Sequence, residues 1–124
     1  MQNDVQKQLQ NELDRYLKNS ADFTPYYPGM NVISSELYKK HLKEAVEIVK
    51  QHNEADVRSF ELYLDTIIIN MHTKVRKYKK SIYFDDENIK DIQNQGFTIP
   101  FYIDEKNKLY ILLGLVNSQA PKSS

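Results

Sequence analysis

Five of seven consecutive residues carry a positive charge in one stretch of the chain. These residues are Lys74, Arg76, Lys77, Lys79 and Lys80, and Tyr78 lies among them. Lysine and arginine side chains can hold phosphates, while an aromatic ring can stack on a nucleobase. The stretch therefore predicts a nucleic-acid-binding surface made by these six residues. The alternative is that the cations complement the end of a helix, with Asp85, Asp86 and Glu87 close enough to neutralise them.

His72 lies next to this basic stretch, and an imidazole can serve as a general acid or base near neutral pH. Lys77 and Lys79, whose ammonium groups can offset negative charge, complete the candidate catalytic set. The alternative is a surface histidine near a helix end.

Metal and cofactor chemistry have little support in the sequence. The three histidines show no metal-ligand spacing, and the chain has no cysteine. Three glycines leave no glycine-rich loop for a nucleotide. We therefore predict neither a metal site nor a cofactor.

Composition favours one soluble, cytoplasmic domain spanning residues 1–124. No apolar stretch is long enough to cross a bilayer, and no secretory signal is recognisable. Equal numbers of basic and acidic residues, 17 of each, argue against a strongly cationic nucleic-acid binder. Nine tyrosines suit either the edges of a core or a protein interface.

Residues 1–29 are expected to form a helix and a linker. Apolar residues of the segment Val5–Leu17 repeat with helical spacing, and they include Leu9, Leu13 and Tyr16. Two prolines and a glycine then break regular structure around Tyr26 and Tyr27. Because apolar side chains are costly to leave in water, these five residues are predicted to bind a protein partner.

Residues 30–80 read as a short strand followed by a helical hairpin. Met30–Ile33 is the strand, and Ser34 or Ser35 caps a helix that begins at Glu36. Asn53 is the expected N-cap of a second long helix, over Val57–Val75.

The rest of the chain predicts a small antiparallel sheet. Ser81–Phe84 is expected to be a strand, and a short helix follows from Asp85 until Gly96 ends it. Residues 97–103 alternate as in a half-buried strand, with a free edge or a bulge at Pro100. Lys108–Val116 is apolar on both faces, as in a central strand. The predicted fold class is α+β, with an N-terminal helix and a helical hairpin packed on a C-terminal antiparallel sheet.

Two segments resemble RelE/ParE-type bacterial toxins over roughly residues 30–122. The run Met30–Leu42 (MNVISSELYKKHL) is similar to their opening strand and first helix. The run Phe101–Val116 (FYIDEKNKLYILLGLV) is similar to their closing hairpin, and Gly114–Lys122 is similar in outline to its end in the HigB-like branch. The resemblance implies a toxin–antitoxin component that cleaves mRNA on the ribosome without a metal, or that poisons gyrase. Its partner would be an antitoxin or a target.

Two other readings stay open. Neutral charge, abundant tyrosine and the lack of a convergent catalytic set fit a non-enzymatic protein-binding module, such as an immunity, anti-defence or regulatory protein. A structural subunit whose N-terminal helix docks on a partner or a second copy is the third possibility.

Overall fold

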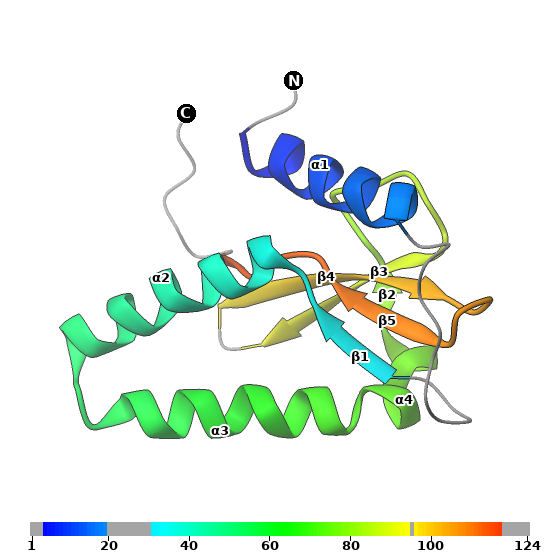
Figure 1. Cartoon of the computed structure of the whole chain (residues 1–124). Coiled ribbons are helices and arrows are strands. Elements are labelled where there is room, and N and C mark those ends of the chain that lie inside the picture. Colours follow the sequence, from blue (N-terminus) through cyan, green and yellow to red (C-terminus); the bar gives the residue numbers. More distant parts are fainter. Residues whose placement is uncertain (1–3, 20–30, 95, 118–124) are drawn as a thin grey trace.

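The computed structural model describes residues 4–19, 31–94 and 96–117. Its helices are α1 (Asp4–Asn19), α2 (Glu36–His52), α3 (Asp56–Ile69), α4 (Met71–Lys74) and the 3-10 turn η2 (Val75–Lys77). Its strands are β1 (Asn31–Ser34), β2 (Lys79–Lys80), β3 (Ile89–Asn94), β4 (Phe97–Asp104), β5 (Leu109–Leu112) and β6 (Val116–Asn117). The fold class is therefore mixed α and β (Figure 1).

The strands form one sheet in the order β1-β5-β4-β3-β2, with β6 beside β4. The pairings β2–β3, β3–β4 and β4–β5 are antiparallel, but β1 is parallel to β5. The expectation of a purely antiparallel sheet is thus wrong at β1. The chain between β1 and β5 includes the helical hairpin, and a connection of that length permits parallel pairing.

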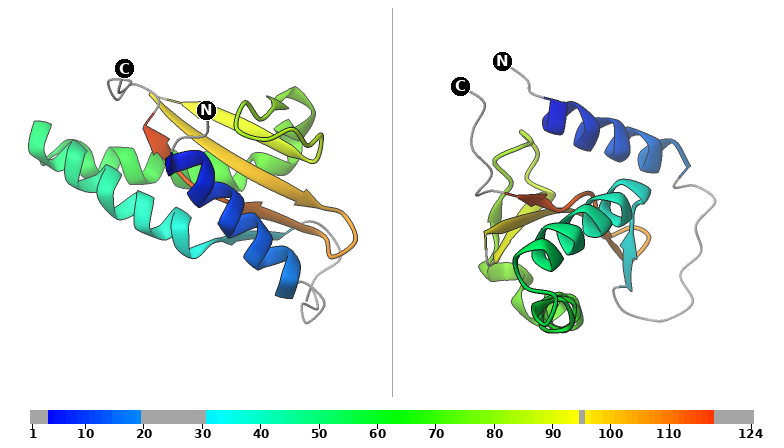
Figure 2. Two further views of the ribbon diagram at one scale, coloured as in Figure 1. Left: turned by 90° about the horizontal axis from the view of Figure 1, so that it is seen from above. Right: turned by 90° about the vertical axis from the view of Figure 1, so that its left-hand side faces the viewer.

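Helices cover both faces of the sheet (Figure 2). Side chains of β5 alternate between two cores: Tyr110 and Leu112 pack with α2, α3 and α4, whereas Leu109 and Ile111 pack with α1. This alternation confirms a central strand with two apolar faces at Leu109–Leu112, but the strand predicted to continue to Val116 is interrupted at residues 113–115. Among the described helices, none is both long and apolar enough to cross a membrane.

Helix α1 belongs to the core of the molecule. Its Leu9 and Leu13 are 0% and 4% exposed, so they stabilise this chain's own sheet and are not free for a partner. The Tyr16 hydroxyl donates to Asp104 Oδ2 at 2.7 Å, and Glu12 Oε2 accepts the N–H of Leu37 at 3.2 Å. The other two predicted partner-binding residues, Tyr26 and Tyr27, lie outside the described residues.

Pro100 creates a bulge, as the sequence predicts. The Leu113 N–H donates to the Pro100 carbonyl at 2.9 Å, but proline has no N–H to return the bond. The β4–β5 pairing ends with Phe101 opposite Leu112, and the β4–β6 pairing begins with Thr98 opposite Val116. Residues 113–115 therefore lie opposite residues 99–100, three against two.

Ser35 donates a hydrogen bond to the Leu113 carbonyl, which Pro100 cannot bind because it has no N–H. Its hydroxyl donates to the Leu113 carbonyl at 3.0 Å and accepts the N–H of Tyr38 at 3.0 Å. One side chain therefore caps α2, as expected, and ties the helix to the bulge.

Replacement of Ser35 by alanine is expected to lower the free energy of unfolding by about 2 kcal/mol, because a helix cap and a half-buried hydrogen bond are lost together. Urea unfolding followed by circular dichroism measures this change. The neighbouring Ser34→Ala is the control, and equal costs for the two variants would contradict the proposed double role.

The hairpin helices differ from expectation at two points. The helix predicted to reach Val75 ends at Ile69, where the Asn70 side chain donates to the Thr66 carbonyl at 2.9 Å. Asn53 does not occupy the N-cap position of α3, which is held by Ala55. Its backbone N–H closes α2 instead, and its side chain accepts the N–H of Ala55 at 3.1 Å.

The predicted strand at Ser81–Phe84 and the predicted helix from Asp85 to Gln95 are both wrong. The former consists of turns, and residues 89–94 form strand β3, which pairs along its whole length with β4. The Asp86 carboxylate accepts the N–H of Asn88 at 2.8 Å, so the acidic cluster begins a turn and not a helix. Pairing with β4 outweighs this weak local helix signal.

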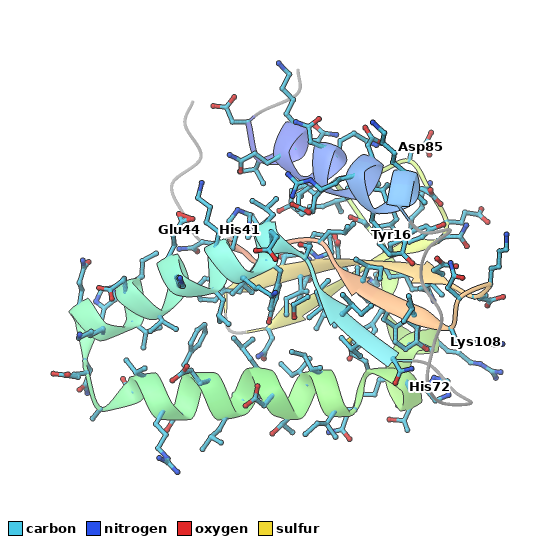
Figure 3. The ribbon with its side chains drawn as sticks, viewed as in Figure 1. Tyr16, His41, Glu44, His72, Asp85 and Lys108 are labelled. Atoms are coloured by element: carbon cyan, nitrogen blue, oxygen red, sulfur yellow. The ribbon has the colours of Figure 1, made fainter. Side chains whose placement is uncertain are left out.

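Gly114 lies where α1, α2 and the bulge meet. A Cβ at this position would come within 2.5 Å of Leu9 Cδ2 and 3.1 Å of His41 Nδ1. His41 Nδ1 accepts the N–H of Leu115 at 3.1 Å. Figure 3 labels His41 and Glu44, both on α2. Burial lowers the pKa of His41, while the negative charge of Glu44 raises it and the positive charge of Lys40 lowers it. The neutral imidazole is therefore the form that the fold prefers.

We expect His41 to lower the free energy of unfolding in mild acid. Its pKa is lower when folded than when unfolded, so the unfolded chain binds more protons and stability falls as the pH drops below about 6.5. Urea unfolding at pH 7.5 and 5.5 measures the difference. In His41→Gln this part of the pH dependence should disappear, and an unchanged difference would contradict the assignment.

Candidate functional site

The site begins with a hollow of about 940 Å³ between α4–η2 and the sheet. Its lining includes His72 and Arg76 from the helical side, and Lys90, Glu105, Lys108 and Tyr110 from the strands and the β4–β5 turn. Figure 3 shows His72 and Lys108 at the same end of the molecule. We call this hollow the basic groove, because three cations and one carboxylate line it.

A histidine and a tyrosine form a pair inside the basic groove. His72 Nδ1 lies 2.9 Å from the Tyr110 hydroxyl oxygen. Tyr110 is 3% exposed, and burial raises the pKa of its hydroxyl, followed by the negative charge of Glu105. The phenol therefore keeps its proton, and because a hydroxyl can both donate and accept, this bond fits either neutral tautomer of the exposed His72 ring.

Aromatic packing holds Tyr110 in place. Its ring meets Phe101 edge-on at a centroid distance of 5.8 Å, and Phe101 meets Tyr78 in the same way at 5.8 Å. Such T-shaped contacts define the orientation of each ring. The position of His72 relative to the sheet therefore depends on a row of core aromatics.

The cations of the basic groove differ in whether they have a partner within the protein. Lys90 Nζ donates to the Val75 carbonyl at 2.9 Å, and so stabilises the end of the helical segment. Arg76 and Lys108 are exposed and form no ion pair with any described residue. These two side chains remain available to a phosphate or a carboxylate of a ligand.

Lys108 has a backbone conformation that is uncommon for a residue with a side chain. Its φ is 59°, in the left-handed region. The turn before it is fastened by Asp104, whose carboxylate accepts the N–H of Asn107 at 3.1 Å and the hydroxyl of Tyr16 at 2.7 Å. Helix α1 thus helps to position a cation of the groove. Backbone strain of this kind is often found at functional sites.

The predicted basic surface is divided by η2. Arg76 faces the basic groove, but Lys77, Tyr78, Lys79 and Lys80 line a different hollow at the β2–β3 edge, which also includes Asp91 and Gln93. We call it the lysine hollow. Lys74 is exposed and lines neither one.

The predicted catalytic set is divided in the same way. His72 lies in the basic groove, whereas Lys77 and Lys79 lie in the lysine hollow. Lys80 is paired with Asp85 at 2.8 Å, so the acidic cluster does neutralise part of the basic stretch. Tyr78 is half-buried against Phe101, which leaves less of its ring for stacking.

Sequence reasoning missed several polar residues of these hollows. Lys90, Lys108 and Tyr110 join His72 in one, and Asp91 joins the lysines in the other. The single available signal was Lys108, a cation directly after a predicted turn. In the described ranges no group of three or more potential ligands could hold a metal ion.

No family model matches the chain, and no curated protein matches it. The relationship to RelE/ParE-type toxins therefore stays a prediction from the sequence, and the function has to be argued from the groove itself.

Proposed function

We propose that this chain is a toxin-like protein of the RelE/ParE kind that acts on translation in the cytoplasm, by binding RNA in the basic groove and cleaving it without a metal ion. One observation carries this proposal: the His72–Tyr110 pair lies in a groove that also presents Arg76 and Lys108. Support also comes from the order of short strand, helical hairpin and sheet, which the sequence resemblance implies. An antitoxin partner follows from the same resemblance.

The chemistry proposed for the groove is transesterification. The 2′-hydroxyl of one nucleotide loses its proton and attacks the adjacent phosphorus, and the bond from phosphorus to the 5′ oxygen breaks. The products are a 2′,3′-cyclic phosphate and a 5′-hydroxyl, so no water or oxidant is consumed. His72 Nε2 transfers one of the two protons and solvent carries the other. Arg76 and Lys108 offset the charge that develops on the phosphorane.

Inducible expression in a bacterial host tests this function. We expect growth arrest that is relieved in the double variant Arg76→Gln/Lys108→Gln, because the phosphate would lose both free cations. Pulse labelling of protein and DNA synthesis then separates the two targets of the toxin family. Protein synthesis should stop first, whereas an early stop of DNA synthesis would indicate gyrase.

The matched control is Lys43→Gln/Lys50→Gln, which removes the same charge from exposed positions of α2 outside the groove. This variant should arrest growth as the parent chain does. Equal arrest by the groove variant would remove the groove from the proposal. Normal growth with soluble parent protein present would contradict the toxin function.

A protein-binding module is the second candidate, and one surface favours it. Leu62, Tyr63 and Ile69 of α3 are 54%, 48% and 79% exposed, which is unusual for three apolar residues on one helix. The surface is apolar and not the tyrosine-rich one expected, since Tyr63 is the single exposed tyrosine among those in the described part of the chain. Loss of a co-purifying partner in Leu62→Gln/Ile69→Gln, with no growth arrest by the parent chain, would favour this candidate.

A further inference from the structure

The lysine hollow brings several lysines together with one buried carboxylate. It has a volume of about 310 Å³ at the β2–β3 edge, and its lining includes three lysines, Lys77, Lys79 and Lys80. It also includes Asp91, which lies directly opposite Lys79 in the β2–β3 ladder. No ion pair joins these two side chains in the described structure.

Asp91 has an unused hydrogen-bond acceptor. The residue is 6% exposed, and its Oδ2 accepts the N–H of Ile82 at 3.0 Å. Its Oδ1 is buried and is the one such side-chain atom in the described residues without a hydrogen-bond partner. Buried polar atoms are nearly always paired, so this oxygen requires an explanation.

The environment of Asp91 makes its charge costly for folding. Burial raises the pKa of its carboxyl above the usual value, against the effect of the bonds from Ser81 and Ile82. An asparagine would keep the acceptor for Ile82 without a buried charge. A group that lowers stability while lining a hollow is a candidate for ligand binding.

The charges around the hollow restrict what it can bind. The ammonium groups of Lys77 and Lys79 repel a cation such as an arginine side chain and attract an anion, whereas Lys80 is paired with Asp85. A carboxylate oxygen accepts only from an N–H or O–H donor. A ligand that binds the lysines and Asp91 together has a phosphate near the ammonium groups and an N–H donor near the carboxylate oxygen. A nucleotide has this combination.

We propose that the lysine hollow recognises a guanine base of the RNA strand whose phosphates lie in the basic groove. Guanine is the RNA base with two adjacent donors, N1–H and the N2 amino group, on the edge that an unpaired base presents. Both can point to Asp91 Oδ1, while the side-chain amide of Gln93 donates to the guanine O6. Uracil offers a single N–H between two carbonyls, which the carboxylate repels.

The two hollows are close enough for one strand. Arg76 lines the basic groove and the next residue, Lys77, lines the lysine hollow. The two hollows therefore lie on either side of the short turn η2. Asp91 Oδ1 is covered in the free protein. Binding of a base therefore requires side chains at the hollow to change rotamer, as side chains at binding surfaces commonly do. This subsite rests on the proposed function, which supplies the strand.

Mononucleotide titration of the full-length protein, followed by NMR, tests the subsite. We expect GMP to bind about tenfold more tightly than UMP, as one added hydrogen bond to a charged acceptor implies. The amide signals that shift with GMP should be those of residues 77–80 and 91–93. Equal affinities for GMP and UMP, or shifts confined to other residues, would overturn the proposal without any variant.

Two variants separate base recognition from charge. Asp91→Asn should lose the preference for GMP and unfold at the same or a higher temperature, because a buried charge is removed. Lys79→Gln should weaken GMP and UMP alike, since it acts on the phosphate. A preference that survives in Asp91→Asn would overturn the proposal, and so would a lower unfolding temperature, which would make Asp91 a structural residue.

The guanine subsite and the toxin function can fail independently of each other. Guanine preference without growth arrest would leave the subsite in place and contradict the toxin function. Growth arrest that depends on Arg76 and Lys108, combined with equal GMP and UMP affinities, would support the toxin function and contradict the guanine subsite.

Discussion

Leu9→Ala is expected to lower the free energy of unfolding by about 3 kcal/mol, within the range for a fully buried leucine. Leu9 packs with Leu13, Ile111 and Leu113 under α1, and its Cδ2 lies where a Cβ on Gly114 would clash. The surroundings cannot collapse into the space it leaves, because α1 is also fastened through Tyr16. Urea or thermal unfolding measures the loss.

Leu17→Ala on the same helix is the control, because this side chain is 45% exposed. It should cost less than about 1 kcal/mol. The contrast tests whether α1 is part of the core or a docking element for another protein. Equal and small effects in both variants would mean that α1 does not pack on the sheet in solution.

The second large effect is expected at His72. If the groove cleaves RNA, His72→Ala should slow cleavage of a labelled RNA by about 10²- to 10⁴-fold, the usual contribution of a general acid or base. Cleavage by the parent protein should continue in EDTA and yield a 2′,3′-cyclic phosphate. The measurement is single-turnover cleavage with and without ribosomes.

Two variants control this result. His52→Ala removes an exposed histidine at the end of α2, outside the groove, and should leave the rate unchanged. Tyr110→Phe keeps the packing on Phe101 but removes the hydroxyl beside Nδ1, so it should reduce the rate less than His72→Ala. Unchanged cleavage in His72→Ala would exclude His72 from the chemistry.

Local patterns were sufficient for the long helices and for the strand at residues 97–104. The apolar stripe of α1 and the Ser35 cap of α2 are encoded in adjacent turns. The alternation of residues 97–103 predicted the strand β4 but not its burial, because Thr98 and Pro100 are buried as well as Ile99 and Phe101. Pro100 predicted its bulge for the same reason, since the missing N–H is a property of the residue itself.

Local patterns failed at residues 85–95. Ile89 and Ile92 are three apart, a spacing that suits one face of a helix. In the structure they lie on opposite faces of β3, with Ile89 in the core under α1 and Ile92 in the core under the hairpin. Only the partner strand β4 decides between these readings, and a short window of sequence does not include it.

The sequence by itself determined which segments are amphipathic, where they are capped, and that His72 lies beside a cluster of cations. The tertiary structure decided that α1 covers the sheet, that β1 is parallel to β5, and that Arg76 and Lys77 line different hollows. The physical reason is the range of the interactions. Helix periodicity and capping act over a few residues, whereas a site joins side chains such as His72 and Tyr110, which are brought together by the packing of distant segments.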